Sequence, residues 1–403
     1  MKEPASLVRE LAETRARTDA LFAMIRPDSL YERPIPERHR LVFYLGHLEA
    51  FEWNLICRGE LSMAPFQADF DQLFAFGIDP PAGQLPNDTP SDWPPVSEVL
   101  KYNARVRRAL DEVLNGATEE VLHIAVEHRL MHAETFAYIL HSLAPDRKVS
   151  IRHRPRSSSP VPVHTPITIP EGTATLGRRR RDGFGWDNEF EAQAVTVPTF
   201  AISKYKVTNR QYVEFLRAGA QPPHFWTRRG DEWFWRTMFG EVLLPLDWPV
   251  YVTYEQARSY AEWVGKSLPT EVQFHRAAYG TPGEEERAYP WGEEAPTPQC
   301  GNFNSYQWDP IPVTASPQGD SAFGVSQLVG NGWEWTATEF HPFHGFQPYP
   351  LYPDYSARFF DGSHRVVKGG SSQTATRLLR RSFRNWFRPQ YPYVYAGFRC
   401  VEN

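Results

Sequence analysis

Cysteine, long apolar runs and excess positive charge are all scarce in this chain. Its 403 residues include three cysteines, too few and too scattered for a disulfide framework, which favours a reducing compartment. No run of about eighteen apolar residues is present, so no membrane span is expected. The charged N-terminal segment lacks the basic and apolar regions of a signal peptide. A net charge of −5 argues against nucleic acid as the main partner. These absences predict a soluble, cytoplasmic protein.

The composition that remains is that of a multidomain globular protein. A hydrophobic fraction of 41% over 403 residues can build sizeable cores, and a chain of this length predicts two or three domains. Aromatic residues make up 14%, and there are 36 prolines. That combination indicates a domain in which irregular loops pack on aromatic side chains.

The first part of the chain, residues 1–146, reads as helical. Apolar residues recur with helical period near 4–26, 37–59, 94–114 and 118–143, with a Pro-, Asp- and Asn-rich loop at 77–95. Four helices of this length predict an up-and-down bundle, an architecture that builds metal sites from side chains on facing helices.

The sequence pattern changes after the predicted bundle. Residues 147–166 are basic, rich in Ser and Pro, and without periodicity, which predicts a linker. In residues 167–403, short β-type runs alternate with Gly, Pro and Asn turns, and helices are expected near 208–218 and 254–264. This pattern predicts an α+β domain, so the whole chain is expected to be an α+β multidomain protein.

Two histidines in the last predicted bundle helix are the strongest chemical signal. His128 and His132 are four residues apart, so on a helix both imidazoles can reach one metal ion. The spacing alone also fits a chance pair or a semi-buried polar pair. A third histidine, His47, lies among apolar residues of the second helix, where a lone histidine is usually an ordinary core residue. Together, two helices would supply a three-imidazole face with other positions open, which is a catalytic rather than a closed structural geometry.

Short motifs along the chain carry a family resemblance. In order, these are 183–189 (GFGWDNE), 207–209 (VTN), 249–250 (PV), 268–271 (LPTE), 289–292 (YPWG), 330–335 (GNGWEW), 368–371 (KGGS) and 397–399 (GFR). They closely resemble the formylglycine-generating-enzyme domain, a C-type-lectin-like α+β fold. The bundle, with its His-x-x-x-His-x-Glu signature and an upstream His, resembles the DinB-like domain. The pairing resembles the ergothioneine-type sulfoxide synthases, which are non-haem iron enzymes, and within them it looks closest to the selenoneine synthase branch.

The resemblance implies a reaction and a set of site residues. It implies Fe(II) held by His47, His128 and His132, with O2 as co-substrate, and attachment of a chalcogen to the imidazole C2 of Nα-trimethylhistidine (hercynine). Glu134 would be a partner that orients a ligand histidine, or else a solvated helix carboxylate. The hercynine site is expected between the domains. Its expected lining is Arg384, Asn385, Trp386 and Phe387, and the expected catalytic tyrosine is Tyr349 or Tyr355.

The chalcogen donor depends on departures from the family pattern. Synthases that use γ-glutamylcysteine resemble one another in an acid and an arginine that hold the donor's polar head, where this chain has Phe387 and Gln390. Met131 likewise stands where the family often has Gln. An apolar site loses affinity for a charged head, so the donor is expected to be a seleno-sugar, which makes the chain a selenoneine synthase. The alternative is an ergothioneine-type synthase using cysteine or γ-glutamylcysteine.

Two other functions stay open, and one is disfavoured. A three-histidine bundle also occurs in zinc-dependent thiol transferases, in which the metal activates a thiol. The C-terminal domain could also bind ligands without chemistry of its own. Formylglycine generation is disfavoured, because it needs two active-site cysteines near the C-terminal end and only Cys400 lies there.

Overall fold

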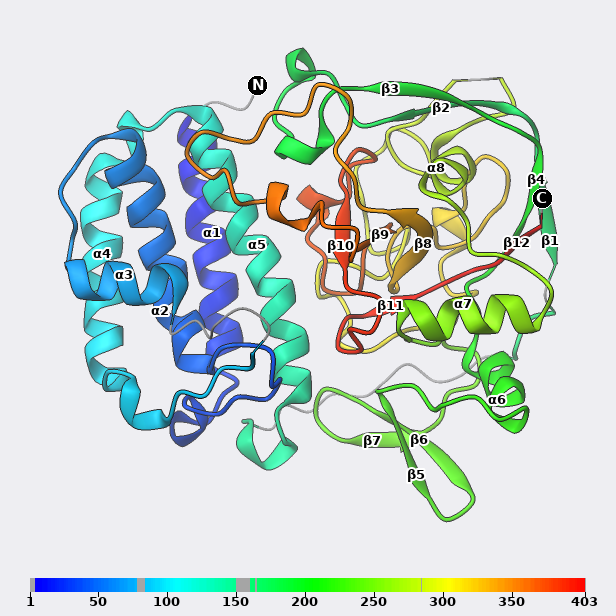
Figure 1. Ribbon diagram of the computed structural model, residues 1–403, viewed down its shortest axis with the longest axis horizontal. Helices are drawn as coiled ribbons and strands as arrows, with labels where there is room; N and C mark the ends of the chain where they lie inside the picture. Colours follow the sequence, from blue (N-terminus) through cyan, green and yellow to red (C-terminus); the bar gives the residue numbers. More distant parts are fainter. Residues whose placement is uncertain (1–3, 78–83, 150–159, 164, 284, 403) are drawn as a thin grey trace. The chain divides into compact units, whose positions relative to one another are not determined.

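The chain forms two compact units, residues 1–152 and 153–403. The computed structural model describes residues 4–77, 84–149, 160–163, 165–283 and 285–402. The first unit is helical and the second contains both helices and strands, as their sequence patterns predict (Figure 1). No helix in the described ranges combines the length and apolarity needed to cross a bilayer.

The first unit is a bundle of four long helices with shorter elements between them. The α-helices are α1 (Pro4–Phe22), α2 (Leu41–Glu52), α3 (Ala68–Phe76), α4 (Val96–Val113) and α5 (Glu119–Ser142). A π-helix, Trp53–Glu60, continues α2 directly. Single 3-10 turns lie at Pro27–Ser29, Pro90–Asp92, Leu114–Gly116 and Pro145–Arg147. The four long helices fall where the apolar periodicity predicts them.

Helix α3 is an element that the periodicity did not predict. It has nine residues and no Ser, Thr, Asp or Asn at its N-cap, so its sequence carries a weak start signal. Its first turn is instead closed by Asp71, whose carboxylate accepts the backbone N–H groups of Phe66 at 2.7 Å and Gln67 at 3.2 Å. Tyr102 on α4 donates to the same carboxylate at 2.7 Å, which ties α3 to the bundle.

The bundle extends past the boundary expected at residue 146. Lys148 bridges to Ile25, and its buried ammonium donates to the carbonyl of Leu140 at 3.0 Å. Val149 donates its backbone N–H to Met24 at 2.8 Å. Residues 147–149 therefore pack with the helices instead of serving as linker. Most of the predicted linker, 150–159 together with 164, lies outside the described residues, and β1 already begins at Pro166.

The second unit is built from small sheets joined by long loops. Its strands are β1 (Pro166–Ile169), β2 (Gly172–Leu176), β3 (Gln193–Val197), β4 (Phe200–Ser203), β5 (Trp226–Arg229), β6 (Glu232–Arg236), β7 (Glu241–Leu243), β8 (Trp333–Glu339), β9 (Arg365–Lys368), β10 (Asn385–Phe387), β11 (Ala396–Gly397) and β12 (Val401–Glu402). They form the sheets β1-β4-β12, β10-β9-β8-β11, β2-β3 and β5-β6-β7. Neighbouring strands are antiparallel except β11 and β8, which run parallel.

Three α-helices accompany these sheets: α6 (Asn209–Arg217), α7 (Tyr254–Trp263) and α8 (Glu271–Tyr279). Each begins at a threonine whose hydroxyl accepts the N–H of a glutamine three residues on. This reciprocal capping box satisfies orphan donors of the first turn. Helices α6 and α7 were predicted, whereas α8 was missed. Short 3-10 turns lie at Arg180–Asp182, Asp187–Glu189, Pro317–Gly319, Ala357–Phe359 and Thr376–Leu378.

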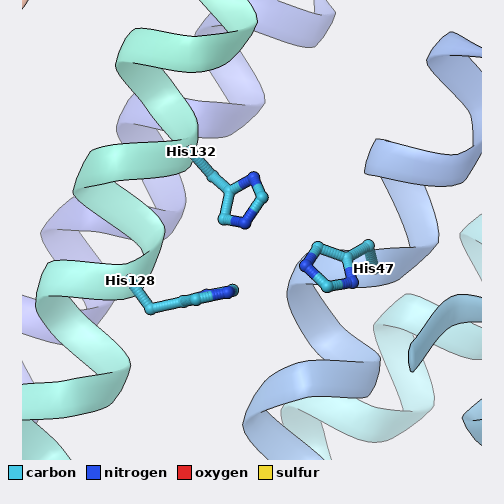
Figure 2. A group of neighbouring side chains, drawn as sticks. All are labelled: His47, His128 and His132. Atoms are coloured by element: carbon cyan, nitrogen blue, oxygen red, sulfur yellow. The ribbon is translucent and has the colours of Figure 1, made fainter. Parts of the chain in front are cut away.

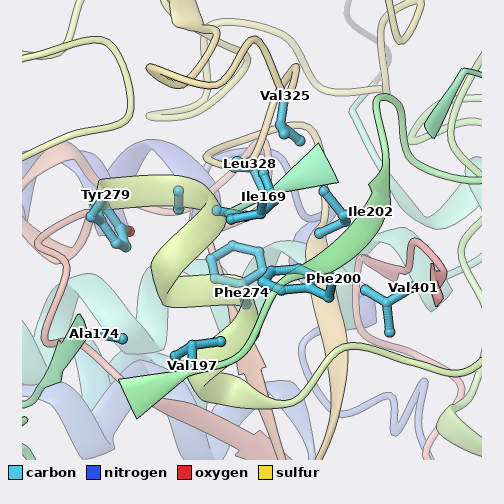
Figure 3. Packing of buried hydrophobic residues seen from close by; sticks show 12 residues of the cluster. Ile169, Ala174, Val197, Phe200, Ile202, Phe274, Tyr279, Val325, Leu328 and Val401 are labelled. Carbon is cyan, nitrogen blue, oxygen red and sulfur yellow. The ribbon is translucent and has the colours of Figure 1, made fainter. Parts of the chain in front are cut away.

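One apolar cluster joins α8 to the sheets of this unit (Figure 3). Phe274 on α8 is fully buried and packs in one cluster with Ile202 of β4 and Val197 of β3. In the same unit, Lys206, Glu334 and Arg399 form a fully buried ionic group, with Glu334 Oε1 2.6 Å from the Lys206 ammonium. Strand β8, which carries Glu334, is thereby anchored, and β9 and β10 are added along its edge.

Candidate metal centre

Three histidines converge inside the helical unit. His47 extends from α2, and His128 and His132 extend from α5, with the rings directed toward one another (Figure 2). Their potential ligand nitrogens all lie within 4.8 Å of one another. Ring centroids are 4.8 Å apart for His47 and His132, and 4.4 Å apart for His128 and His132. The structure thus brings together the three residues that the sequence predicted as ligands.

A backbone carbonyl from α3 sets the tautomer of His47. Nδ1 of this ring lies 2.7 Å from the carbonyl oxygen of Phe74. Because a carbonyl can only accept, Nδ1 carries the proton and Nε2 keeps its lone pair for a metal. The close approach requires Gly46, since a Cβ there would lie 2.6 Å from atoms of the Phe74 ring. This orienting group was missed because α3 was not predicted.

Aromatic rings line the histidines. Phe51 stacks on His128 with centroids 3.4 Å apart and planes 8° from parallel. Phe43 stacks on His47 at 4.8 Å and 25°. Phe43, His47 and Phe51 are spaced four residues apart on consecutive turns, so one stripe of α2 supplies both a ligand and the walls beside it. The rings restrict the rotation of the imidazoles and keep water from their faces.

Burial keeps the three imidazoles neutral. Burial, together with the charges of the nearby His39 and Arg129, lowers the pKa of His47 to about 4 even though its hydrogen bond to the Phe74 carbonyl raises it. Burial also lowers the pKa values of His128 and His132 well below the usual range, and the neighbouring histidines add to the effect. Nδ1 of His132 is buried and makes no hydrogen bond with the described residues. Neutral imidazoles with converging lone pairs fit a divalent transition metal, and three ligands leave coordination positions for substrates.

Glu134 is buried on α5, which argues against a solvated helix carboxylate. It follows His132 by two residues and His128 by six, so at about 100° per residue its side chain leaves the helix about 160° from the first and about 120° from the second. Its role as a partner that orients a ligand histidine stays a prediction. For His47, the Phe74 carbonyl provides such a contact.

In the second unit, the predicted substrate segment is strand β10 and the residue before it. The Arg384 guanidinium is 2% exposed and donates to both oxygens of Glu271, at 3.0 and 3.2 Å, and to the carbonyl of His341 at 3.0 Å. These bonds tie β10 to α8 and occupy the guanidinium. A direct role for Arg384 in holding substrate, which the sequence suggested, is therefore disfavoured.

The neighbouring side chains are better placed to meet a ligand. Trp386 is half-buried and stacks on Phe340, with centroids 4.1 Å apart and planes 8° from parallel. The side-chain oxygen of Asn385 accepts the backbone N–H of Trp386 at 2.9 Å, so the amide NH2 group takes no part in this bond. Phe387 is half-buried and its ring is parallel to that of Tyr391 at 6.0 Å.

The two candidate tyrosines have different surroundings. Tyr349 is buried and donates its hydroxyl to the carbonyl of Gly185. Tyr355 is buried too, but it stacks on Trp186 at 3.9 Å and meets Trp386 edge-on at 5.5 Å and 81°. Tyr349 also meets Trp186, at 6.3 Å, so the difference is the direct contact of Tyr355 with Trp386, a predicted substrate residue, which favours Tyr355 of the two.

The cysteines do not form a reactive pair. Cys57, Cys300 and Cys400 are all free and buried. Burial raises the pKa values of Cys57 and Cys400 to about 12, so both remain protonated thiols at neutral pH.

Fold and site together define a class: a DinB-type helical bundle with a three-histidine centre, joined to a sulfatase-modifying-factor-type domain. Residues 10–141 match the DinB superfamily, and residues 153–403 match the Sulfatase-modifying factor enzyme 1-like domain. The chain is 32% identical to a hercynine oxygenase of Mycolicibacterium thermoresistibile, over 98% of this chain and 94% of the relative. A hercynine oxygenase of Mycobacterium tuberculosis is 39% identical over 53% of this chain and 55% of the relative.

A fungal relative extends the comparison. Ergothioneine biosynthesis protein 1 of Neurospora crassa is 28% identical over 99% of this chain, which spans 59% of that protein. The chain belongs to the ergothioneine-type sulfoxide synthase family.

Proposed function

We propose that this protein uses iron(II) and O2 to join a chalcogen to the imidazole C2 of hercynine. The observation that carries the proposal is the group of three neutral, converging imidazoles of His47, His128 and His132. The names of the relatives support hercynine as the acceptor and oxygen as the co-substrate.

We propose separate tasks for residues of the two units. Iron(II) held by the three histidines would supply O2 activation and open positions for the substrates. Phe43 and Phe51 hold two of the imidazoles in place. Trp386 offers an aromatic face to the trimethylammonium group, which has no N–H to donate and is recognised by such faces. Tyr355 is the group that we propose to hold the transferable proton, on its phenolic oxygen.

Sulfur is the chalcogen that the relatives support. Ergothioneine is a sulfur compound, and the fungal relative is named for its biosynthesis. We therefore propose carbon–sulfur bond formation with cysteine or γ-glutamylcysteine as the first candidate reaction.

A selenium donor is the second candidate, and two residues favour it. Phe387 presents an aromatic ring, and the Gln390 amide donates to the carboxylate of Glu255, so neither position offers an ionic partner to a charged donor head. Arg388, next to Phe387 in the sequence, is exposed and would be the cationic partner available to a charged donor. A neutral seleno-sugar needs stacking surfaces and hydrogen-bonding partners for its hydroxyl groups, which the rings of Phe387 and Tyr391 and the Tyr391 hydroxyl would supply.

The decisive experiment compares metals and donors in one assay. The protein is purified anaerobically, its metal is quantified, and hercynine is added with O2 and equal concentrations of cysteine, γ-glutamylcysteine or a seleno-sugar. Bound iron, O2 consumption and a hercynine–chalcogen product by mass support the proposal, and the preferred donor identifies the chalcogen. Bound zinc with O2-independent thiol transfer would contradict it and favour the transferase.

A further inference from the structure

An arginine that is not part of the histidine centre connects three helices beside it. Arg129 follows His128 on α5 and is 1% exposed. Its Nε donates to Glu52 Oε1 on α2 at 2.6 Å, and one terminal nitrogen donates to the Thr18 hydroxyl on α1 at 3.0 Å. The other terminal nitrogen forms an ion pair with Glu49 Oε1 on α2 at 3.2 Å, but it makes no hydrogen bond with the described residues. One guanidinium therefore bridges α1, α2 and α5.

The two carboxylates on α2 are each shared with a second arginine. Arg15 on α1 donates to Glu52 Oε2 at 2.8 and 3.0 Å. Arg107 on α4 donates to Glu49 Oε1 at 2.6 Å and to Asp19 on α1 at 2.7 Å. Burial raises the pKa of Glu52, but the charges of Arg129 and Arg15 outweigh this and lower it, so the carboxylate is ionised. The result is a continuous ionic network across four helices.

The network lies beside the imidazoles on the same two helices. At about 100° per residue, Glu49 and Glu52 leave α2 about 160° and about 140° from His47, whereas Arg129 leaves α5 about 100° from His128 and about 60° from His132. The contacts that the Arg129 guanidinium makes are with Thr18, Glu49 and Glu52. These contacts join α5 to α1 and α2, so Arg129 acts on the distance and rotation between α2 and α5.

Directional bonds are needed for that task. Other contacts between α2 and α5 are made by packed rings, such as Tyr44 with Phe136 and Phe51 with His128, and the burial of apolar surface is non-directional. A guanidinium fork, in contrast, binds carboxylates in a fixed planar geometry. Burying paired charges brings little net stability, because the cost of removing them from water offsets their attraction. Fixing one arrangement of α2 and α5 is a physical reason for burying them.

We propose that Arg129 is a positioning residue, which holds α2 against α5 through Glu52 and Glu49 and so sets the spacing of the three histidines. The inference rests on the proposed metal site. It predicts that removing the Arg129 guanidinium lowers metal affinity even when the helical unit stays folded.

Cobalt binding to the full-length protein tests this without requiring turnover. Co²⁺ is titrated anaerobically into the wild type, Arg129→Met, Arg129→Lys and Glu52→Gln, and its visible absorption reports affinity and ligand geometry. We expect the Met and Gln variants to bind Co²⁺ roughly 10- to 100-fold more weakly, with altered spectra, as when other groups that orient ligands are lost. The Lys variant should be intermediate, because an ammonium is a point charge that cannot reproduce the fork.

A matched control removes a buried charge elsewhere. Glu334→Gln breaks the ionic group with Lys206 and Arg399 in the second unit, so it should lower the Tm but leave Co²⁺ affinity unchanged. Circular dichroism identifies the folded variants. If Arg129→Met does not fold, the Co²⁺ affinities of Arg129→Lys and Glu52→Gln provide the test.

The outcomes separate two failures. Folded Arg129 and Glu52 variants with the affinity and spectrum of the wild type would overturn this inference while leaving the metal site intact. A wild-type protein that binds no Co²⁺ would overturn the metal site and this inference together.

Discussion

Gly46 lies directly against Phe74, so that α3 crosses α2 where a side chain would otherwise stand. A Cβ at residue 46 would come within 2.6 Å of three atoms of the Phe74 ring. This contact allows the Phe74 carbonyl to reach Nδ1 of His47 at 2.7 Å. A residue with no side chain thus controls the orientation of a proposed metal ligand.

Gly46→Ala should weaken metal binding. Alanine improves helix propensity by about 1 kcal/mol, but overlap with a packed ring costs about 1–3 kcal/mol, so net destabilisation is expected. Displacing α3 also removes the partner of His47, and metal affinity should fall roughly 10- to 100-fold. Co²⁺ titration and thermal unfolding measure both effects. Gly116→Ala is the control, because the nearest atom there is 3.9 Å away, and unchanged affinity in Gly46→Ala would contradict the role of this contact.

His132→Ala should lose bound iron and turnover. Two imidazoles remain in that variant, and two ligands rarely hold a transition metal in the absence of a third. Metal analysis after anaerobic loading provides the measurement. His141→Gln changes another buried histidine of α5, at a position outside the converging group, and should keep its iron. Full iron and activity in His132→Ala would show that the ligand assignment is wrong.

Trp386→Ala should selectively weaken hercynine binding. A cation over an aromatic face contributes about 0.5–2 kcal/mol, so affinity should fall roughly 3- to 30-fold for hercynine. Histidine, which lacks the quaternary nitrogen, should be affected less. Isothermal titration of the metal-loaded protein compares the two ligands. The control is Trp263→Ala, which removes an exposed tryptophan of α7. Equal losses for both ligands would argue against this recognition.

His224 should make the second unit less stable in mild acid. Burial and the charge of Arg236, whose guanidinium lies 2.7 Å from Nε2, together lower its pKa to about 4. The unfolded chain takes up a proton below pH of about 6.5, whereas the folded protein does not. Stability is therefore full above about pH 6.5 and declines toward pH 4. After allowance for partial solvent screening, the loss should be about 1–2 kcal/mol.

Urea unfolding at pH 7 and at pH 4.5 measures this contribution. In His224→Gln, the difference in unfolding free energy between the two pH values should shrink by about that amount. His341→Gln, at an exposed position, should leave the difference unchanged. An unaltered pH dependence in His224→Gln would contradict the assignment.

The sequence by itself determined the features that depend on local geometry. A helix has a fixed period, so the four-residue spacing of His128 and His132 already placed both on one face of α5. The same period predicted the four long helices, and the change of pattern after the bundle predicted the second unit. Short motifs indicated the family, which the matches to 10–141 and 153–403 confirm.

Only the tertiary structure decided which groups surround those histidines. Helix α3 is short and weakly signalled, and the carbonyl that orients His47 comes from 27 residues away. The partners of Arg129 come from α1 and α2, and no sequence pattern near residue 129 indicates them. Arg384 looked available for substrate until Glu271, 113 residues distant, occupied it. The physical reason is the same in each case: hydrogen bonds and ion pairs form between groups that folding brings together, and local periodicity carries no information about which distant groups will meet.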